Sequence, residues 1–326
     1  MIPLSQAPSL GIKHIGIGVF DGVHRGHQEI IATVLQQSQT PQECAILTFH
    51  PHPLEIISPE KAPLRLTSPL RMEYWIHHYG VPHLIAIPFD EKLRHFSPHE
   101  FILWLKRHLP QLQSISVGFN WRFGFNGLGT TLTLVDLGSQ LNFSTHIVPP
   151  LTIENEPASS TRIREAVLQK NFSLADQLLG HSFEISGTVI HGDGKGKTLG
   201  FPTANLTPHR QLLPPFGTYA CLATVEGITY RSVLNYGLRP TFEKKTAQIE
   251  VHLIGFTGDI YQKEILLNQW VWLREEQKFP NLPALQSQIA SDIEKTLKIP
   301  YSSYSSQTQI LHSNSVSIPL PPKINS

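Results

Sequence analysis

Short apolar runs and amphipathic stretches alternate along the first half of the chain. The apolar runs, bounded by glycine or polar residues, predict buried strands at 12–19, 45–49, 84–88, 115–117 and 146–148. The amphipathic stretches predict helices at 26–37, 68–79 and 97–109, and Ser97 with Glu100 predicts a capping box at the start of the third helix. Repeated strand–helix units favour an α/β domain in which helices cover both faces of a doubly wound parallel sheet.

The pattern changes after about residue 180. Short strands separated by glycine and proline are expected at 184–190, 219–225, 229–235, 248–254 and 264–273, and a helix is expected at 285–297. Such a series predicts an antiparallel barrel or sandwich. We therefore expect one domain at 1–182 and a second at 183–299. Residues 300–326 are rich in serine, glutamine and proline without periodicity, which predicts a flexible tail.

Composition narrows the class of protein. The chain has 326 residues and a hydrophobic fraction of 40%, which suits two domains with buried cores. Its 26 lysines and arginines balance 25 aspartates and glutamates, which argues against binding to nucleic acid or to an anionic membrane. Cys44 and Cys221 lie in apolar runs and are expected to be buried free thiols. With no apolar run long enough to span a membrane and no signal-peptide pattern, a cytoplasmic location is expected.

The first predicted strand ends in a segment rich in small residues and histidine, at the position where doubly wound sheets bind ligands. Its candidates for contact with a nucleotide are Gly18, Phe20, Asp21 and Gly22. His24 and His27 share one face of the following helix, where they can donate hydrogen bonds to a phosphate. Two alternatives stay open: a structural turn capped by the histidines, and a metal site completed by His50 and His52, although the spacing matches no zinc pattern.

A second polar segment opens a helix near residue 160. Hydroxyl groups can cap this helix, and two arginines lie close to its start, where they are unfavourable for the helix dipole unless an anion binds there. The candidates for holding that anion are Ser160, Thr161, Arg162 and Arg164. The alternative is an ordinary hydroxyl cap with solvated arginines.

Together these segments resemble the FAD synthetase family of nucleotidyltransferases. The resemblance is carried by Gly-x-Phe-Asp-Gly-x-His-x-Gly-His at 18–27, Thr-Phe-His-Pro-His-Pro at 48–53 and Ser-Ser-Thr-Arg-Ile-Arg at 159–164. It implies a nucleotidyltransferase fold in the first half. It also implies that His24 and His27 stabilise the transition state of adenylyl transfer and that the segment from Ser160 to Arg164 binds the phosphates of ATP.

One segment departs from that family's pattern. Where the family has Gly-x-Asp-Phe-x-Phe-Gly, this chain carries Asn120 and Trp121. Asparagine keeps hydrogen-bonding capacity but loses a charge, so Asn120 is retained as a candidate ligand residue and slower adenylyl transfer is expected if the carboxylate contributes. Phe49, Phe123 and Phe125 are candidates for stacking on a flavin, with core packing as the alternative.

In the second half, a glycine-rich stretch at 187–198 carries two lysines and ends in Gly-Lys-Thr. It is not a Walker loop, because His191 stands where the first glycine belongs and Pro202 prevents a helix from following. Backbone amides in such a stretch can still hold phosphates, which makes Gly192 and Lys197 candidates. Just beyond it, Thr203 and Asn205 offer two neutral oxygens on one side of an extended segment, a donor set that suits magnesium bound to a nucleotide.

This half resembles the riboflavin kinase family. The matching blocks are the stretch from Gly187 to Leu206, with Leu-Gly-Phe-Pro-Thr-Ala-Asn at 199–205, and the segments 214–220, 235–242, 249–252 and 273–279. The resemblance implies a small antiparallel barrel, Thr203 and Asn205 as magnesium ligands, and Arg274 as a flavin or nucleotide residue. It also implies that Glu250 is the general base that takes a proton from the ribityl 5′ hydroxyl. Lys197 and Tyr236 replace the commoner arginine and isoleucine.

The two resemblances together imply an enzyme with two sequential reactions. The C-terminal domain is expected to phosphorylate riboflavin to FMN, and the N-terminal domain to adenylylate FMN to FAD with release of pyrophosphate. Both reactions require ATP and Mg²⁺, and no nucleic-acid or membrane partner is expected. The alternatives are a riboflavin kinase whose N-terminal half has weakened or lost adenylyl transfer, and a non-catalytic flavin-binding protein.

Overall fold

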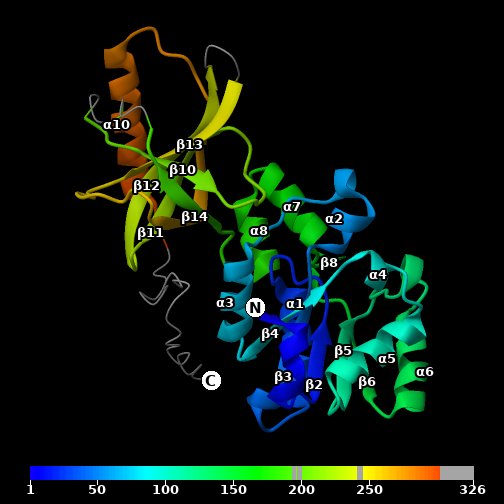
Figure 1. Cartoon of the computed structure of the whole chain (residues 1–326). Coiled ribbons are helices and arrows are strands. Elements are labelled where there is room, and N and C mark those ends of the chain that lie inside the picture. The colour runs from blue at the N-terminus through cyan, green and yellow to red at the C-terminus, as the bar shows by residue number, and fades with distance from the viewer. Residues whose placement is uncertain (193–195, 197–199, 241–244, 302–326) are drawn as a thin grey trace. The chain divides into compact units, whose positions relative to one another are not determined.

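The computed structural model describes residues 1–192, 196, 200–240 and 245–301. The predicted phosphate residue Lys197 and the expected tail beyond Tyr301 therefore lie outside the described residues. The described residues form two compact units, 1–160 and 161–301. Figure 1 labels their helices and strands.

The first unit is built on a six-stranded parallel sheet, which confirms the predicted architecture. The strands follow the order β1-β4-β3-β2-β5-β6, with bounds β1 (Ile2–Pro3), β4 (His83–Pro88), β3 (Cys44–His50), β2 (His14–Ile17), β5 (Ser114–Gly118) and β6 (Ser144–Val148). The chain runs outward from β2 through β3 to β4, and then continues on the other side of β2 as β5. The strand order therefore reverses between β2 and β5.

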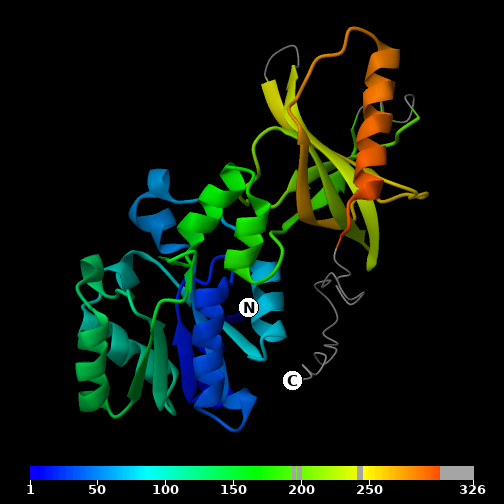
Figure 2. The same cartoon turned by 180° about the vertical axis from the view of Figure 1, so that it is seen from behind.

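Helices cover both faces of this sheet (Figure 2). On one face α1 (Arg25–Gln36) and α3 (Pro69–His78) pack on the strands, and on the other α5 (Pro98–His108) and α6 (Thr131–Leu141) do so. Alternate strand residues supply the two cores, as Ile15 and Leu47 face α5 while Ile46 faces α1. The predicted capping box of α5 is present, with the Ser97 amide donating to Glu100 at 2.8 Å.

Several short elements lie outside the expectations from periodicity. They include α2 (Pro53–Ile57), α4 (Glu91–Arg94), the 3₁₀ turns η1 (Leu4–Leu10), η2 (Pro41–Glu43), η3 (Pro59–Lys61) and η4 (Phe125–Gly127), and the antiparallel pair β7 (Thr152–Ile153) and β8 (Glu156–Pro157). Segments of two to seven residues are too short to show a helical or strand period. The longer helix α6 also went unpredicted.

The second unit contains α7 (Ser160–Leu168) from its second residue onward and α8 (Phe172–Leu179). It continues as a closed six-stranded antiparallel barrel, which confirms the barrel that the family resemblance implied (Figure 1). The barrel order is β10 (Ala204–Pro208), β13 (Lys245–Leu253), β12 (Ile228–Pro240), β11 (Gly217–Val225), β14 (Glu264–Arg274) and β9 (Ile185–Ile190). Strand β10 adds a sixth strand to the five that were expected. Helix α10 (Leu282–Lys298) packs on the outside against β11 and β12.

Cys44 and Cys221 are buried free thiols, as expected. Burial raises the pKa of the Cys44 thiol to about 11, so it stays protonated and unreactive. Within the described ranges, we find no helix whose length and apolar character would allow it to cross a membrane.

Candidate active sites

The registers of the barrel strands align a row of polar residues across five strands. Asn205 of β10 lies opposite Glu250 of β13, and Glu250 lies opposite Asn235 of β12. Asn235 pairs with Thr218 of β11, which in turn pairs with Arg274 of β14. Because side chains directly opposite one another in a sheet share a face, the predicted base, one predicted metal ligand and the predicted arginine point to the same side.

This row faces away from the apolar interior of the barrel. Ile249 and Val251, which flank Glu250, are 3% and 0% exposed, so alternation turns Glu250 to the opposite face, as the sequence predicted. A cavity of about 350 Å³ lies on that face and is lined by all five members of the row together with Thr203. Its other wall comes from α10 and the segment before it, through Gln277, Phe279, Leu285 and Ile289.

The two predicted magnesium ligands each have a glycine packed against them. A Cβ on Gly192 would lie 1.8 Å from Nδ2 of Asn205, and a Cβ on Gly196 would lie 2.8 Å from Oγ1 of Thr203. Side chains at these glycines would therefore displace the two polar groups. Two neutral oxygens in a shared cavity, with bare backbone beside each, fit a magnesium ion that is also held by phosphates and water. Thr203 and Asn205 both line the cavity, and Gly192 lies against the Asn205 amide. Their role as magnesium ligands stays a prediction.

Arg274 is held by a residue that the sequence analysis missed. Its Nε and Nη2 each lie 2.9 Å from Oδ2 of Asp292, whose side chain is only 1% exposed. Gln288 donates to the other carboxylate oxygen at 2.9 Å, and Nη1 of Arg274 donates to the carbonyl oxygen of Glu275. The sequence contained a signal for this pair. Asp292 continues the apolar stripe that begins with Leu285 and Ile289, and a carboxylate in a buried stripe needs a charged partner. The guanidinium is thus oriented along the cavity wall.

A second cavity of about 600 Å³ adjoins the first. Both cavities are lined by Gly196 and Thr203, but Glu250, Asn235 and Arg274 line only the smaller one. The larger cavity is mainly apolar, with contributions from Val189, Val251, Leu253, Phe256, Ile260 and Tyr261. The barrel therefore offers two compartments that meet at Thr203.

In the parallel-sheet unit, the predicted ligand residues gather at the carboxyl ends of the central strands. Gly18 directly follows β2, Gly118 ends β5, and the chain leads on to the exposed Asn120. The strand order reverses between these two strands, and ligands of doubly wound sheets bind at such a switch point. A Cβ on Gly18 would lie 3.1 Å from the ring of Phe20, so a larger residue there would press on that ring.

The turn after β2 is tightly folded. Phe20, Gly22 and Val23 all have positive φ angles, of 53°, 86° and 40°, and the Val23 amide donates to the Phe20 carbonyl at 3.1 Å. The ring of Phe20 is fully buried in the core beneath α1 and α3, so it supports the turn by packing. Contact of the Phe20 and Gly22 backbone with a nucleotide stays a prediction.

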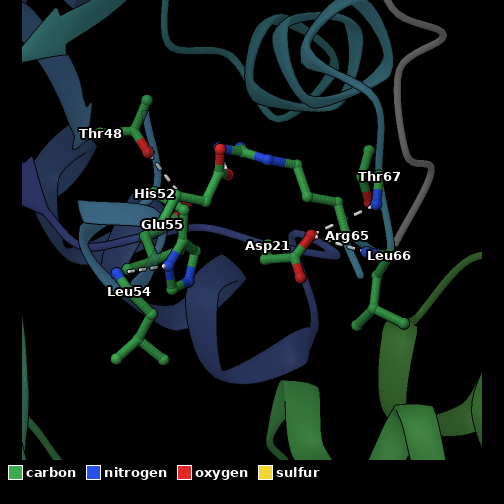
Figure 3. A network of polar contacts seen from close by, with 9 residues as sticks. Asp21, Thr48, His52, Leu54, Glu55, Arg65, Leu66 and Thr67 are labelled. Carbon is green, nitrogen blue, oxygen red and sulfur yellow. Dashed lines mark hydrogen bonds and ion pairs between the residues drawn. The ribbon is translucent and has the colours of Figure 1, made fainter. Parts of the chain in front are cut away.

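Asp21 connects this turn to a distant loop (Figure 3). Its carboxylate is 2% exposed and accepts hydrogen bonds from the amides of Leu66 at 2.9 Å and Thr67 at 3.2 Å. The neighbouring Arg65 pairs with Glu55 at 3.2 Å. Asp21 is a predicted nucleotide-binding residue. In the structure one of its carboxylate oxygens positions the loop, a structural role that no sequence motif indicated.

His24 and His27 lie together at the start of α1. Their rings stack with centroids 3.7 Å apart, and His24 occupies the N-cap position. Burial, with a smaller contribution from the neighbouring His24, holds the pKa of His27 well below its ordinary value. His27 is therefore neutral near pH 7 and can donate a hydrogen bond from one ring nitrogen. Gly26 allows this packing, since a Cβ there would lie 3.2 Å from the His24 ring.

The alternative metal site is not assembled. In the part of the chain that the structure describes, no three histidine, cysteine, aspartate or glutamate side chains are grouped as ligands of a metal ion. His52 instead uses Nδ1 to accept a hydrogen bond from the Leu54 amide at 3.1 Å and so caps α2 (Figure 3).

The predicted anion segment is divided between the two units. The hydroxyl of Ser160, which belongs to the first unit, donates to the carbonyl oxygen of Asp21 at 2.8 Å. Thr161 is exposed, and Arg162 and Arg164 are partly buried members of the second unit. Binding of ATP phosphates by these three residues stays a prediction.

The aromatic candidates differ in their surroundings. Phe123 is 5% exposed within the core, and Trp121 stacks on it with ring centroids 4.5 Å apart, so the Trp121 substitution extends that core. Phe49 contacts Phe89 edge-on, and Phe125 stacks on His95. For Phe123, core packing is the arrangement observed, and flavin stacking by Phe49 and Phe125 stays a prediction.

Comparison with known families identifies the class of protein, a two-domain transferase that uses ATP. A sequence profile described as FAD synthetase matches residues 9–162, and one described as riboflavin kinase matches residues 179–300. The chain belongs to the family of bifunctional riboflavin kinases/FMN adenylyltransferases.

The relatives that support this assignment align over most of their length. The bifunctional riboflavin kinase/FMN adenylyltransferase of Escherichia coli strain K12 is 36% identical over 294 residues, which cover 89% of this chain and 93% of the relative. The Bacillus subtilis protein of the same description is 36% identical over 305 residues, which cover 91% and 94%. A Streptococcus pneumoniae crystal structure, described as a macrolide-efflux protein, is similar with a TM-score of 0.80 and 28% identity over 91% of this chain and 99% of that chain.

Proposed function

We propose that the barrel transfers the γ-phosphoryl group of ATP to the 5′ hydroxyl of riboflavin, and that the parallel-sheet unit transfers an adenylyl group from a second ATP to the FMN so formed. The observation that carries the kinase reaction is the polar row from Asn205 through Glu250 to Arg274, which lines one cavity together with Thr203.

The two cavities of the barrel suggest how the kinase substrates are arranged. Glu250 lines only the smaller cavity, so the ribityl chain of riboflavin belongs there, with its 5′ hydroxyl at the carboxylate. The larger, apolar cavity suits the nucleoside of ATP. Because the cavities meet at Thr203, the γ-phosphate lies where the two substrates approach each other.

In the kinase step, the Glu250 carboxylate accepts the hydroxyl proton as the ribityl oxygen attacks the γ-phosphorus, and ADP leaves. Mg²⁺ held by Thr203 and Asn205 would supply charge neutralisation for the phosphates. Arg274, fixed by Asp292, would hold the substrate in line with the attacked phosphate. Gly192 and Lys197 would add phosphate contacts from the glycine-rich stretch.

In the adenylyl step, a phosphate oxygen of FMN attacks the α-phosphorus of ATP, and pyrophosphate leaves. Neutral His27, stacked on His24, donates a hydrogen bond to the phosphate oxygen on which charge grows. Gly18 and Gly22 keep the backbone close to the nucleotide, and Asn120 approaches it from the end of β5. Ser160 holds the turn, and Arg162 and Arg164 would contact the remaining phosphates.

We assign adenylyl transfer to residues 1–182 and phosphoryl transfer to 183–299. The family profiles support a division in this region, because the FAD synthetase profile ends at residue 162 and the riboflavin kinase profile begins at residue 179. The buried free thiols Cys44 and Cys221 suit an enzyme of the reducing cytoplasm.

Chromatography of the flavins tests the proposal. The purified chain, incubated with riboflavin, ATP and Mg²⁺, should form FMN and then FAD. Glu250→Gln should abolish FMN formation and leave FAD formation from supplied FMN intact, whereas His27→Ala should have the opposite effect. FMN without FAD would indicate a kinase alone, and unchanged riboflavin would indicate a binding protein.

A further inference from the structure

Strand β13 carries two polar residues beside the proposed base. Gln248 and His252 lie two residues before and two residues after Glu250, so alternation puts all three on one face of the strand. Glu250 and His252 both line the smaller cavity. Gln248 contacts one of the two proposed magnesium ligands, and His252 contacts the residue that directly precedes the other.

Gln248 holds Asn205. Its Nε2 group donates a hydrogen bond to Oδ1 of Asn205. A carbonyl oxygen has two lone pairs, so this bond fixes the direction of the amide and leaves the second lone pair for a cation. Gly192 lies on the nitrogen side of the same amide, where an added Cβ would come within 1.8 Å of Nδ2.

His252 holds the backbone that leads into Thr203. Its Nδ1 lies 2.7 Å from the carbonyl oxygen of Pro202, and because a carbonyl accepts only, Nδ1 carries the proton. The peptide between Pro202 and Thr203 is planar, so fixing its oxygen also fixes the nitrogen of Thr203. Phe201 contacts the same imidazole edge-on, with ring centroids 5.9 Å apart, and limits its rotation.

We propose that Gln248 and His252 are positioning residues of the kinase reaction, each holding one of the two magnesium ligands in place beside Glu250. A single strand then supplies the base and the supports for both ligands, so that the distance from base to metal is set by the register of β13 and β10. This inference rests on the proposed function, specifically on Thr203 and Asn205 as magnesium ligands.

The test compares His252→Ala with His252→Asn in the full-length protein. An asparagine amide can replace the Nδ1 donor, whereas alanine cannot. Residues that support metal ligands affect metal affinity by about 10- to 100-fold. We expect His252→Ala to raise the Mg²⁺ concentration for half-maximal FMN formation by at least about tenfold, and His252→Asn to restore most of the loss.

A second readout does not depend on turnover. ADP is titrated into the protein by calorimetry at several Mg²⁺ concentrations without riboflavin. The Mg²⁺-dependent part of the affinity should weaken in His252→Ala and recover in His252→Asn. The parallel-sheet site is identical in all variants, so differences between them report on the barrel. Unchanged FAD formation from FMN shows that the parallel-sheet unit is intact, and an unchanged thermal unfolding curve followed by circular dichroism serves as the folding control for the barrel.

Thr203→Ala separates the two ways of failing. If it shifts the Mg²⁺ dependence while His252→Ala behaves as the unchanged protein, or if His252→Asn is as impaired as His252→Ala, the positioning role is wrong. If Thr203→Ala has no effect either, the magnesium site is misassigned and the inference falls with it. Should His252→Ala unfold the barrel, Gln248→Leu carries the same test through Asn205.

Discussion

Replacing Asp292 with alanine would remove the carboxylate that orients Arg274. The two atoms of the guanidinium that bind Asp292 lie 2.9 Å from Oδ2, and the side chains are 19% and 1% exposed. Removal of one partner of a buried ion pair costs about 3–5 kcal/mol. Because Arg274 reaches some solvent, we expect the lower end, about 3 kcal/mol, which for a unit of this size is a fall in Tm of roughly 10 °C.

The same change should affect catalysis through the position of Arg274. Without Asp292 the guanidinium can leave the cavity wall, so kcat/KM for riboflavin should fall by about tenfold or more, equivalent to roughly 1.4 kcal/mol of transition-state binding. FMN adenylylation in the same protein should not change. Thermal unfolding followed by circular dichroism and initial rates of FMN formation are the two assays.

Matched variants test whether the ion pair between Asp292 and Arg274 has this role. Asp292→Asn keeps an acceptor of the same shape and should lose less stability than Asp292→Ala. In a double-mutant cycle, Arg274→Met should make Asp292→Ala less costly, because no buried guanidinium then lacks its partner. Additive losses in that cycle, or a kinase rate unchanged in Asp292→Ala, would show that the pair does not position Arg274.

The buried histidines and Gly192 provide three further tests of the sites and of the fold. Binding of ATP should raise the depressed pKa of His27, seen as a shift of its NMR titration towards higher pH, and an unchanged titration would exclude phosphate contact. The parallel-sheet unit should lose stability as pH falls below about 6.5. Burial lowers the folded-state pKa of several of its histidines and so stabilises their neutral form, namely His14, His77, His78 and His83. Denaturation midpoints that stay constant from pH 7.5 to 5.5 would contradict this. Gly192→Ala should reduce FMN formation by at least about tenfold, since its Cβ would overlap the Asn205 amide, while FAD formation from FMN persists; a fully active variant would place the metal elsewhere.

Predicting the fold and predicting the site depend on different information in the sequence. Local patterns identified the parallel sheet and the series of antiparallel strands, because each strand or helix must turn its own apolar residues toward a core. Short segments such as α2 and β1 were not predicted, because they are too short to show a hydrophobic period and depend on contacts with neighbouring elements. Helix α6 was not predicted either, although it carries a capping box between Thr130 and Thr133.

The sequence by itself determined the two domains, the motif residues and the outward face of Glu250, because alternation along a strand is a local property. Tertiary structure decided which residues from distant segments meet. The row from Asn205 to Arg274 depends on the registers of five strands. Pairing in a barrel couples residues far apart in the chain, and no single segment records its partner's register. For the same reason the contacts that Asp292, Gln248 and His252 make with the site are evident only in the folded barrel.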